Sequence, residues 1–347
     1  MNSEHGVIPL LSICIPSYNR PIQLSKLLNS IDPLVFDEIE IVICEDKSPR
    51  RDQIVDVVNK FKCNNIVECK LFLNEVNLGY DGNIKELINK SSGKYVMYMG
   101  DDDIFQVSSL KKYITFLKNN EELGYILRRY TVIHNNGNME DFKYFDTDRF
   151  FEPGVNAFKL LFRKSVFISG FCFKREYVLP YYNTNQFNGT LLYQLFLCSN
   201  LVMEYPSAYC NIPITIMDDN SRGVPEFGSS VNESSNYTPG HISIQNSINF
   251  MKSYLVITNY VDTRYNFNAT KIVLDDLSRY SFPILSIQRS AGIVKFLKYN
   301  QELIKSIKIN STFYYYIYFF ALLFFGTNIC NKIISLIKKT LGKTPNL

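Results

Sequence analysis

The chain has 347 residues with a formal net charge of +4, and 46% of them are hydrophobic and 14% aromatic. This length and composition allow a large buried core and exclude an intrinsically disordered chain, and the small net charge gives no sign of general nucleic-acid binding. The eight cysteines are scattered without a Cys-x-x-Cys pair, which is typical of a reducing compartment and not of a disulfide framework.

The first 120 residues alternate between apolar runs and amphipathic segments. The apolar runs predict strands at residues 10–15, 39–44, 66–73 and 95–99. The segments between and after them predict helices at about residues 25–31, 54–61, 84–88 and 108–119. This alternation predicts a doubly wound α/β fold, with a mostly parallel sheet and helices on both faces. Right-handed crossovers then place every strand-to-helix turn along one edge of the sheet.

The fourth predicted strand runs directly into three consecutive carboxylates, Asp101, Asp102 and Asp103. Like charges this close repel each other unless a cation shares them, and Mg²⁺ or Mn²⁺ carrying a phosphate is the simplest resolution. The alternative is an acidic, solvated loop in which Asp103 caps the next helix. The polar turns at 16–20, 45–46 and 77–83 should lie on the same edge, and this convergence favours the metal and phosphate site.

From Gly124 onward the alternation breaks down. We expect a hairpin at 125–134 and 139–145, a helix at 155–162, a strand at 166–174 and a helix at 190–199. The polar stretch at 218–240 predicts a mobile loop, and a helical, increasingly basic region follows it.

Residues 309–331 carry no charge, and within them residues 313–325 are wholly apolar or aromatic. This apolar core is short for a membrane crossing, which takes about 20 apolar residues. A tyrosine-rich apolar segment flanked by lysines suits the membrane interface, so we expect peripheral or re-entrant attachment. The alternative is a helical hairpin packed on the soluble domain or in a dimer.

Over about the first 105 residues the chain resembles the GT-A glycosyltransferases of family 2. The matching elements, in order, are Ile-Pro-Ser-Tyr-Asn-Arg at 15–20, the strand ending in Glu45-Asp46, Asn77-x-Gly79 followed by Gly-Lys-Tyr at 93–95, and Gly-Asp-Asp-Asp-Ile at 100–104. The loop at 77–83 looks most like the abequosyltransferase-like subset, which works on O-antigen and similar surface polysaccharides. The likeness weakens after about residue 125.

The resemblance implies a donor site at the sheet edge. Tyr18 would stack on the nucleotide base, Asp46 would accept a hydrogen bond from that base, and Asn77 and Gly79 would line the ribose and diphosphate. The implied nucleotide-sugar-binding residues are Pro16, Tyr18, Arg20, Glu45, Asp46, Asn77, Gly79, Asp81 and Asp101. The implied metal ligands are Asp102 and, in support, Asp103, with Mg²⁺ or Mn²⁺ neutralising the departing nucleoside diphosphate.

One element of the family pattern is missing. Inverting members often supply a catalytic base from a Gly-Glu-Asp motif that opens a helix, and the corresponding residues 187–194 hold no carboxylate here. Asp218 and Asp219 are the nearest candidates for the base, and Glu204 is a weaker one. Their alternative role is a solvated turn, and the missing motif is also compatible with another stereochemical course or an inactive relative.

These expectations combine into one hypothesis. The chain would be a metal-dependent, hexosyltransferase-type enzyme that moves a sugar from a nucleotide sugar to a glycan or lipid-linked oligosaccharide, in O-antigen or capsule biosynthesis. It would act in the cytoplasm at the inner face of the cell membrane, without nucleic-acid partners. We expect a GT-A domain at 1–240, with a nucleotide-sugar half at 1–123 and an acceptor half at 124–240, and then a helical, membrane-seeking region at 241–347.

Two alternatives stay open. One is a catalytically inactive, membrane-associated scaffold with this fold. The other is a different nucleotide-dependent enzyme on a Rossmann-like sheet, although a dehydrogenase would want Gly-x-Gly-x-x-Gly where this chain has Pro-Ser-Tyr-Asn-Arg at 16–20.

Overall fold

The structure is a computed structural model that describes residues 8–220, 223, 226–240 and 243–341. The chain forms two compact units, Met1–Ser235 and Asn236–Leu347. The division falls a few residues before residue 240, where the sequence places the end of the first domain. The functions expected for the two halves of that domain stay predictions.

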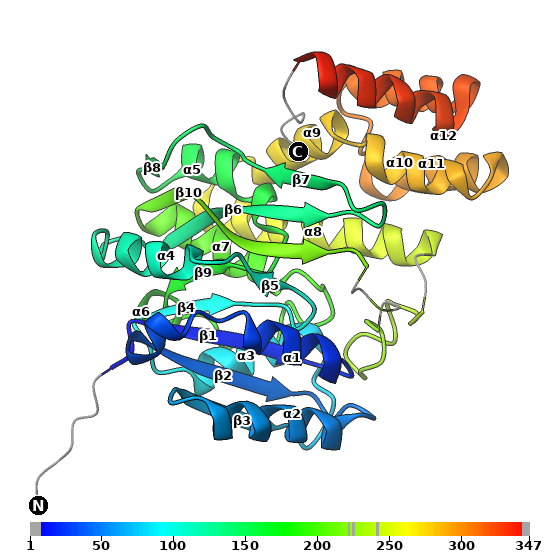
Figure 1. The fold of residues 1–347 in the computed structure, drawn as a ribbon. Coiled ribbons are helices and arrows are strands. Elements are labelled where there is room, and N and C mark those ends of the chain that lie inside the picture. Colours follow the sequence, from blue (N-terminus) through cyan, green and yellow to red (C-terminus); the bar gives the residue numbers. More distant parts are fainter. Residues whose placement is uncertain (1–7, 221–222, 224–225, 241–242, 342–347) are drawn as a thin grey trace, which may run out of the picture. The chain divides into compact units, whose positions relative to one another are not determined.

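The first unit is built on a single mixed sheet, which has ten strands within the described residues (Figure 1). The strand order is β3-β2-β1-β4-β9-β6-β10-β5, with β7 paired to β6 and β8 paired to β10. The strands are β1 (Leu11–Ser17), β2 (Ile39–Glu45), β3 (Glu68–Leu73), β4 (Tyr95–Tyr98), β5 (Ile104–Phe105), β6 (Tyr125–Ile133), β7 (Met139–Phe142), β8 (Arg149–Phe151), β9 (Phe171–Lys174) and β10 (Ser207–Asp218).

The four N-terminal strands are parallel, as the alternating pattern predicts, with β1 between β2 and β4. The second half of the sheet departs from a doubly wound arrangement, because β9 runs antiparallel to both β4 and β6. The predicted hairpin is present as β6 and β7. The predicted strand at 166–174 is shorter, because residues 166–170 form a loop and a turn and only Phe171–Lys174 pair with the sheet.

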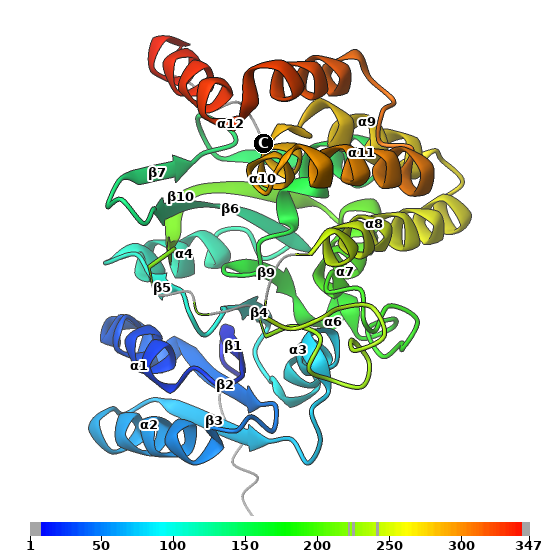
Figure 2. The ribbon, with the colours of Figure 1, turned by 90° about the vertical axis from the view of Figure 1, so that its right-hand side faces the viewer.

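Helices cover both faces of this sheet (Figure 2). The helices α1 (Pro21–Asn29), α2 (Arg51–Asn64) and α4 (Ser109–Lys118) lie on one face, and α3 (Gly79–Lys90) and α7 (Tyr193–Glu204) lie on the other. The short helices α5 (Val155–Leu161) and α6 (Arg175–Val178) pack on α7. A core cluster fills the space between β1, β2 and β4 and the first of these helix layers. The strands β1, β2 and β4 are buried along almost their whole length, which explains their continuous apolar runs, whereas β3 at the edge of the sheet is largely not buried.

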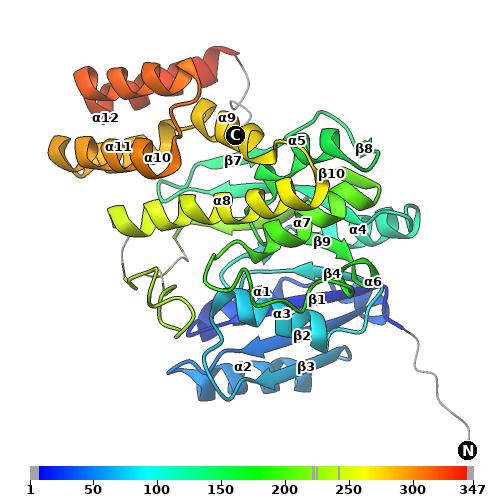
Figure 3. The same ribbon diagram turned by 180° about the vertical axis from the view of Figure 1, so that it is seen from behind.

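The second unit is helical (Figure 3). Its helices are α8 (Ile244–Tyr265), α9 (Ala269–Arg279), α10 (Phe282–Ser290), α11 (Ile293–Ile307) and α12 (Phe313–Leu341). The uncharged segment at 309–331 falls mostly in α12, and residues Phe313–Ile334 are long and apolar enough to cross a membrane by length and composition. The helical φ and ψ angles are interrupted at Gly326, which has φ 69° and ψ 176°.

Candidate functional site

The site begins where the parallel strands end. Ser17 at the end of β1 is in register with Glu45 at the end of β2, and Cys14 of β1 is in register with Tyr98 of β4. The turns that follow these strands therefore lie side by side at one edge of the sheet, as the crossover rule requires. Pro16, near the end of β1, and Tyr18, in the turn that follows, are partly exposed, so the Tyr18 ring is accessible for stacking.

Arg20 joins the first turn to the acidic turn. Its Nη1 lies 2.9 Å from Asp101 Oδ1 and 3.3 Å from Asp102 Oδ2, and the backbone N–H of Tyr18 donates to Asp101 Oδ2 at 3.0 Å. Burial raises the pKa of Asp101 to about 6, against the opposing effect of Arg20. Burial alone would lower the pKa of Arg20, but Asp101 and Asp102 more than compensate and hold it above its usual value. The guanidinium thus neutralises much of the repulsion within the acidic turn.

The three aspartates have different environments. Asp101 and Asp103 are buried, whereas the side chain of Asp102 keeps 15% of its surface exposed. Ser169 Oγ donates to Asp103 Oδ2 and accepts from the backbone N–H of Gly100 at 2.9 Å. Asp102 is therefore the carboxylate of the turn that a ligand can reach, with Asp103 fixed behind it by Ser169.

A divalent cation would find few protein ligands at this edge. Within the described residues, no group of three or more His, Cys, Asp or Glu side chains is arranged to hold a metal. The accessible carboxylate of Asp102 supplies the hard oxygen that Mg²⁺ or Mn²⁺ prefers, and magnesium sites usually combine one or two carboxylates with phosphates and water. The residues therefore fit a metal that a diphosphate helps to hold.

Asp46 is positioned by the loop before α3. Its Oδ1 accepts from Asn74 Nδ2 at 2.8 Å and from the backbone N–H of Leu78 at 2.9 Å, and its Oδ2 accepts from the backbone N–H of Gly79 at 2.9 Å. Gly79 has φ +76°, and its N–H also reaches Asn77 Oδ1 at 3.0 Å. Burial raises the pKa of Asp46 above its usual value. The structure brings three of the predicted donor-site residues together, with Asp46 holding the shape of the loop.

Glu45 has a local structural role instead of facing a ligand. It is fully buried, forms an ion pair with Arg51, and accepts from the backbone N–H groups of Lys47 and Ser48 at 3.1 and 2.7 Å. Three donors thus occupy its carboxylate and fix the turn that leads into α2. Glu45 and Asp46 are thus both buried and both satisfied by donors of the protein, and the contact of Asp46 with a nucleotide base stays a prediction.

Asp81 lies away from the donor loop in which the sequence places it. It is 1% exposed, and its carboxylate accepts from the backbone N–H groups of Thr190, Leu191 and Tyr193 at 2.8, 2.9 and 3.1 Å. Thr190 and Leu191 lie in the turn before α7 and Tyr193 is its first residue, so a carboxylate from α3 holds the turn that leads into this helix. Burial raises the pKa of Asp81 to about 7.

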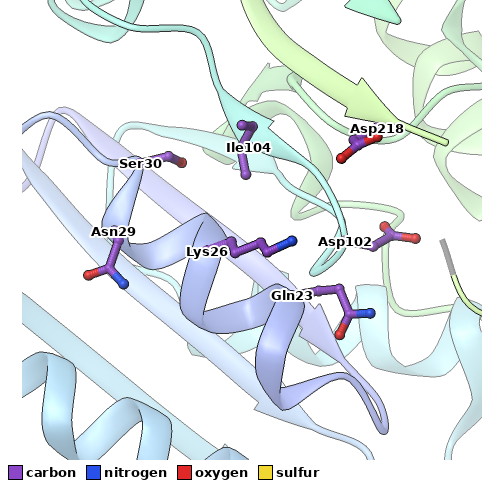
Figure 4. Close-up of a pocket in the computed structure, with 7 residues that line it drawn as sticks. All are labelled: Gln23, Lys26, Asn29, Ser30, Asp102, Ile104 and Asp218. Carbon is purple, nitrogen blue, oxygen red and sulfur yellow. The ribbon is translucent and has the colours of Figure 1, made fainter. Parts of the chain in front are cut away.

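The two candidates for the base, Asp218 and Asp219, differ in their relation to a cavity of about 360 Å³. It is lined by Gln23, Lys26, Asn29, Ser30, Asp102, Ile104 and Asp218 (Figure 4). Asp218 therefore shares a cavity with Asp102. Asp219 instead lies 3.2 Å from His134 Nδ1, and His134 Nε2 lies 2.9 Å from Glu140. Glu204 is the last residue of α7, at the opposite end from the Thr190–Tyr193 turn.

The residues after 225 also reach the donor edge, which the sequence gives no spacing signal to predict. Glu226 accepts two hydrogen bonds from Asn19 Nδ2, at 2.8 and 3.1 Å. Glu233 accepts from the backbone N–H of Tyr80 at 2.6 Å, at the first turn of α3. A Cβ on Gly79 would collide with Ser230 Oγ, so this segment packs directly on the predicted diphosphate loop. Two carboxylates far along the chain thus join the site.

Comparisons with known proteins agree with this architecture. Residues 12–179 match the family model for glycosyl transferase family 2. The chain is 31% identical over 114 residues to abequosyltransferase RfbV of Salmonella typhimurium, over 33% of this chain and 34% of that protein. It is 30% identical over 128 residues to the Escherichia coli UDP-Glc:alpha-D-GlcNAc-diphosphoundecaprenol beta-1,3-glucosyltransferase WfgD, over 37% of this chain and 48% of that protein.

The matched segments thus span only about a third to a half of these relatives. Among solved structures, Staphylococcus aureus TarS residues 1–349 in complex with UDP-GlcNAc superposes with a TM-score of 0.59 at 15% identity, over 96% of this chain and 93% of that one. This likeness confirms the predicted GT-A fold.

Proposed function

We propose that this protein transfers a sugar from a nucleotide-sugar donor to a hydroxyl group of a glycan acceptor, because residues 12–179 match the family model for glycosyl transferase family 2. The pathway we propose is bacterial surface polysaccharide biosynthesis, such as O-antigen or capsule. The observation that supports this proposal most strongly is that Arg20 pairs with Asp101 and Asp102 and so holds the acidic turn against the turn that follows β1. The names of the relatives, one of which acts on a diphosphoundecaprenol-linked sugar, support the choice of pathway.

The donor would bind along the ends of β1, β2 and β4. The Tyr18 ring would stack on the nucleotide base, Asp46 would accept a hydrogen bond from it, and Asp101 would face the ribose. Asn77, which is partly exposed in the loop before α3, would line the ribose and diphosphate. Arg20, which already balances the acidic turn, keeps Asp101 ionised and in place while the donor binds.

We propose that Asp102 holds a divalent cation together with the diphosphate, with Asp103 in support. When bound, Mg²⁺ or Mn²⁺ would neutralise negative charge on the nucleoside diphosphate leaving group. The chain contributes the exposed Asp102 carboxylate and the fixed turn behind it, which Ser169 holds through Asp103 and Gly100.

For the acceptor side we propose Asp218 as the general base. Its carboxylate would take the proton from the acceptor hydroxyl, whose oxygen bonds to the anomeric carbon as the bond from that carbon to the diphosphate oxygen breaks. Asp218 lines the same cavity as Asp102, which supports this choice. Asp219 is the second choice because its carboxylate contacts His134.

We further propose that the acceptor is lipid-linked and that the protein works at the cytoplasmic face of the cell membrane. The apolar stretch Phe313–Ile334 supports attachment to that membrane. Removing the chain from Ser311 onward should release the protein from membrane fractions, and unchanged fractionation would argue against this attachment.

A ligand-binding experiment tests the donor site first. Thermal unfolding of the full chain would be followed with nucleoside diphosphates in the presence of Mn²⁺, Mg²⁺ or EDTA. A ligand at a hundredfold excess over its Kd stabilises the folded state by about 2.7 kcal/mol. The expected result is a stabilisation that EDTA removes and that Asp102→Asn abolishes. The absence of any metal-dependent shift would contradict the proposal.

A transfer assay then separates the enzyme from an inactive scaffold. With a radiolabelled nucleotide sugar and a diphospholipid-linked acceptor, Asp218→Asn should keep donor binding and lose transfer. Asp219→Asn should keep both, and Asp37→Asn, an exposed carboxylate on the 3₁₀ segment at 33–38, is the matched control. Donor binding without transfer in the unaltered protein would favour the scaffold.

A further inference from the structure

The apolar helix α12 is fixed on one side by the helical unit to which it belongs. Tyr315 Oη donates to Asn300 Oδ1 at 2.7 Å, and Phe319 stacks on Phe296 of α11 with ring centroids 5.4 Å apart. Arg289 of α10 donates from Nε to the backbone oxygen of Leu322 at 3.0 Å. A membrane crossing by this segment would carry the Arg289 charge into the bilayer core, which is costly. These contacts therefore argue against a membrane crossing by α12.

The other side of α12 is an unusually apolar surface. Phe313 and Phe324 are each 74% exposed. The further exposed apolar and aromatic side chains of this helix are Tyr314, Tyr316, Ile317, Phe320, Phe325, Ile329, Ile333 and Leu336. A contiguous exposed apolar surface of this kind marks an interaction site in a soluble protein. Its tyrosines are amphipathic rings that suit the boundary between lipid and water.

Helix α11, which packs against α12, also exposes apolar side chains and carries exposed lysines among them. Its inner face buries Phe296, Tyr299, Leu303 and Ile307, and its outer face exposes Ile293, Val294, Leu297 and Ile304. The lysines that share this outer face are Lys295, Lys298 and Lys305. Lysine stems can lie along an apolar surface while their ammonium groups reach lipid phosphates. This arrangement is typical of a helix that lies in the membrane interface.

Residues 282–336 carry an excess of positive charge. Between residues 282 and 336 the only acidic residue is Glu302. The basic residues of the same stretch are Arg289, Lys295, Lys298, Lys305, Lys308 and Lys332. Positive charge next to exposed apolar groups matches an anionic phospholipid surface, to which each nearby lysine adds about 1 kcal/mol of binding. A protein partner or a second copy of the chain would not require this charge pattern.

We propose that α11 and α12 together form a monotopic docking surface for anionic phospholipid membranes, in which Lys295, Lys298 and Lys305 select the lipid charge. This inference deepens the proposed function and rests on it for the identity of the membrane. Membrane binding is measured without catalysis, so a loss of transferase activity would not contradict this inference. A loss of vesicle binding would likewise not contradict the proposed donor site.

Vesicle flotation of the full chain tests the surface. Vesicles of phosphatidylcholine alone are compared with vesicles that also contain phosphatidylglycerol, and Lys295, Lys298 and Lys305 are changed together to Gln. The three changes should lower the affinity for phosphatidylglycerol vesicles by about a hundredfold, since about 1 kcal/mol per lysine is about fivefold each. The affinity for phosphatidylcholine should stay unchanged, and added salt should weaken binding of the unaltered protein only to the anionic vesicles.

The matched control removes the same charge elsewhere. The exposed lysines changed together to Gln in this control are Lys60, Lys111 and Lys112 on α2 and α4. The control should bind anionic vesicles like the unaltered protein, and Phe320→Ser with Phe324→Ser should weaken binding to both kinds of vesicle. Equal losses in the two lysine variants would overturn the proposal. The proposal would also be overturned if the protein bound no vesicles and light scattering instead showed a dimer that Phe320→Ser and Phe324→Ser dissociate.

Discussion

Two turns of the first unit each bury a carboxylate, and they satisfy it in different ways. In the turn at 100–103, Asp101 is paired with the guanidinium of Arg20, and its neighbour Asp102 stays accessible beside the same arginine. In the turn at 187–193, the buried carboxylate is Asp81 of α3, and the backbone N–H groups that begin α7 take up both of its oxygens. A carboxylate balanced by an arginine leaves a charged group for a ligand, whereas one enclosed by N–H donors holds a fold together.

The largest expected effect that tests this contrast is a loss of catalytic activity. Asp102→Asn should lower kcat by about 10²- to 10³-fold, the loss typical of removing one group that stabilises charge in a transition state. Its free energy of unfolding should change little because the side chain is partly exposed. Steady-state kinetics and urea unfolding measure both quantities. Undiminished turnover in Asp102→Asn would break the assignment of the acidic turn to ligand binding.

The next effect is on stability at the other turn. Asp81→Ala should lower the free energy of unfolding by about 3 kcal/mol, since it leaves buried N–H groups at the start of α7 without an acceptor. Urea unfolding measures this, with Asp56→Ala, an exposed residue of α2, as the control that should change by less than about 0.5 kcal/mol. A loss of turnover in Asp81→Ala without a loss of stability would instead assign Asp81 to the chemistry.

The two turns should also make stability depend on pH in the same direction. The pKa of Asp81 is about 7 and that of Asp101 about 6 in the folded protein, each raised by burial from 3.8. The folded state therefore binds more protons than the unfolded state between about pH 4 and pH 7, so stability is greatest at the acid end and falls as pH rises through this window.

The Asp81 part of this loss should be on the order of 1 to 3 kcal/mol, and Asp81→Asn should lack it. Urea unfolding at pH 5 and pH 8 measures the difference. An identical pH dependence in Asp81→Asn and the unaltered protein would contradict the assignment of this titration to Asp81.

The smallest effect concerns the support of the acidic turn. Ser169→Ala removes the hydroxyl that joins Asp103 to Gly100 and should weaken metal-dependent binding of a nucleoside diphosphate by about tenfold, as losses behind a metal ligand do. Calorimetric titration measures it, and Ser25→Ala on α1 is the control. A stronger effect on metal-free than on metal-dependent binding would place the role of Ser169 elsewhere.

The donor side of the site was largely predictable because it is local in the sequence. The segments at 16–20, 45–46, 77–79 and 101–103 each lie at or within a few residues of a strand end, so the chain order and the crossover rule bring them together. The long-range contacts around the site were not predictable in this way. Asp81 and Thr190 are far apart in sequence, and no periodicity relates Glu233 to Tyr80. The predicted roles of the site residues stay predictions until the measurements above are made.

Within the acidic turn, the sequence by itself determined the position of the three carboxylates at a strand end, but not which of them a ligand can reach. That was decided by Arg20 and Ser169, two side chains from distant turns that draw Asp101 and Asp103 inward and leave Asp102 at the surface. The strand pattern is encoded locally because apolar runs and turn residues act over a few positions. The choice among neighbouring carboxylates is tertiary because burial and charge pairing depend on what the folded chain packs against each one.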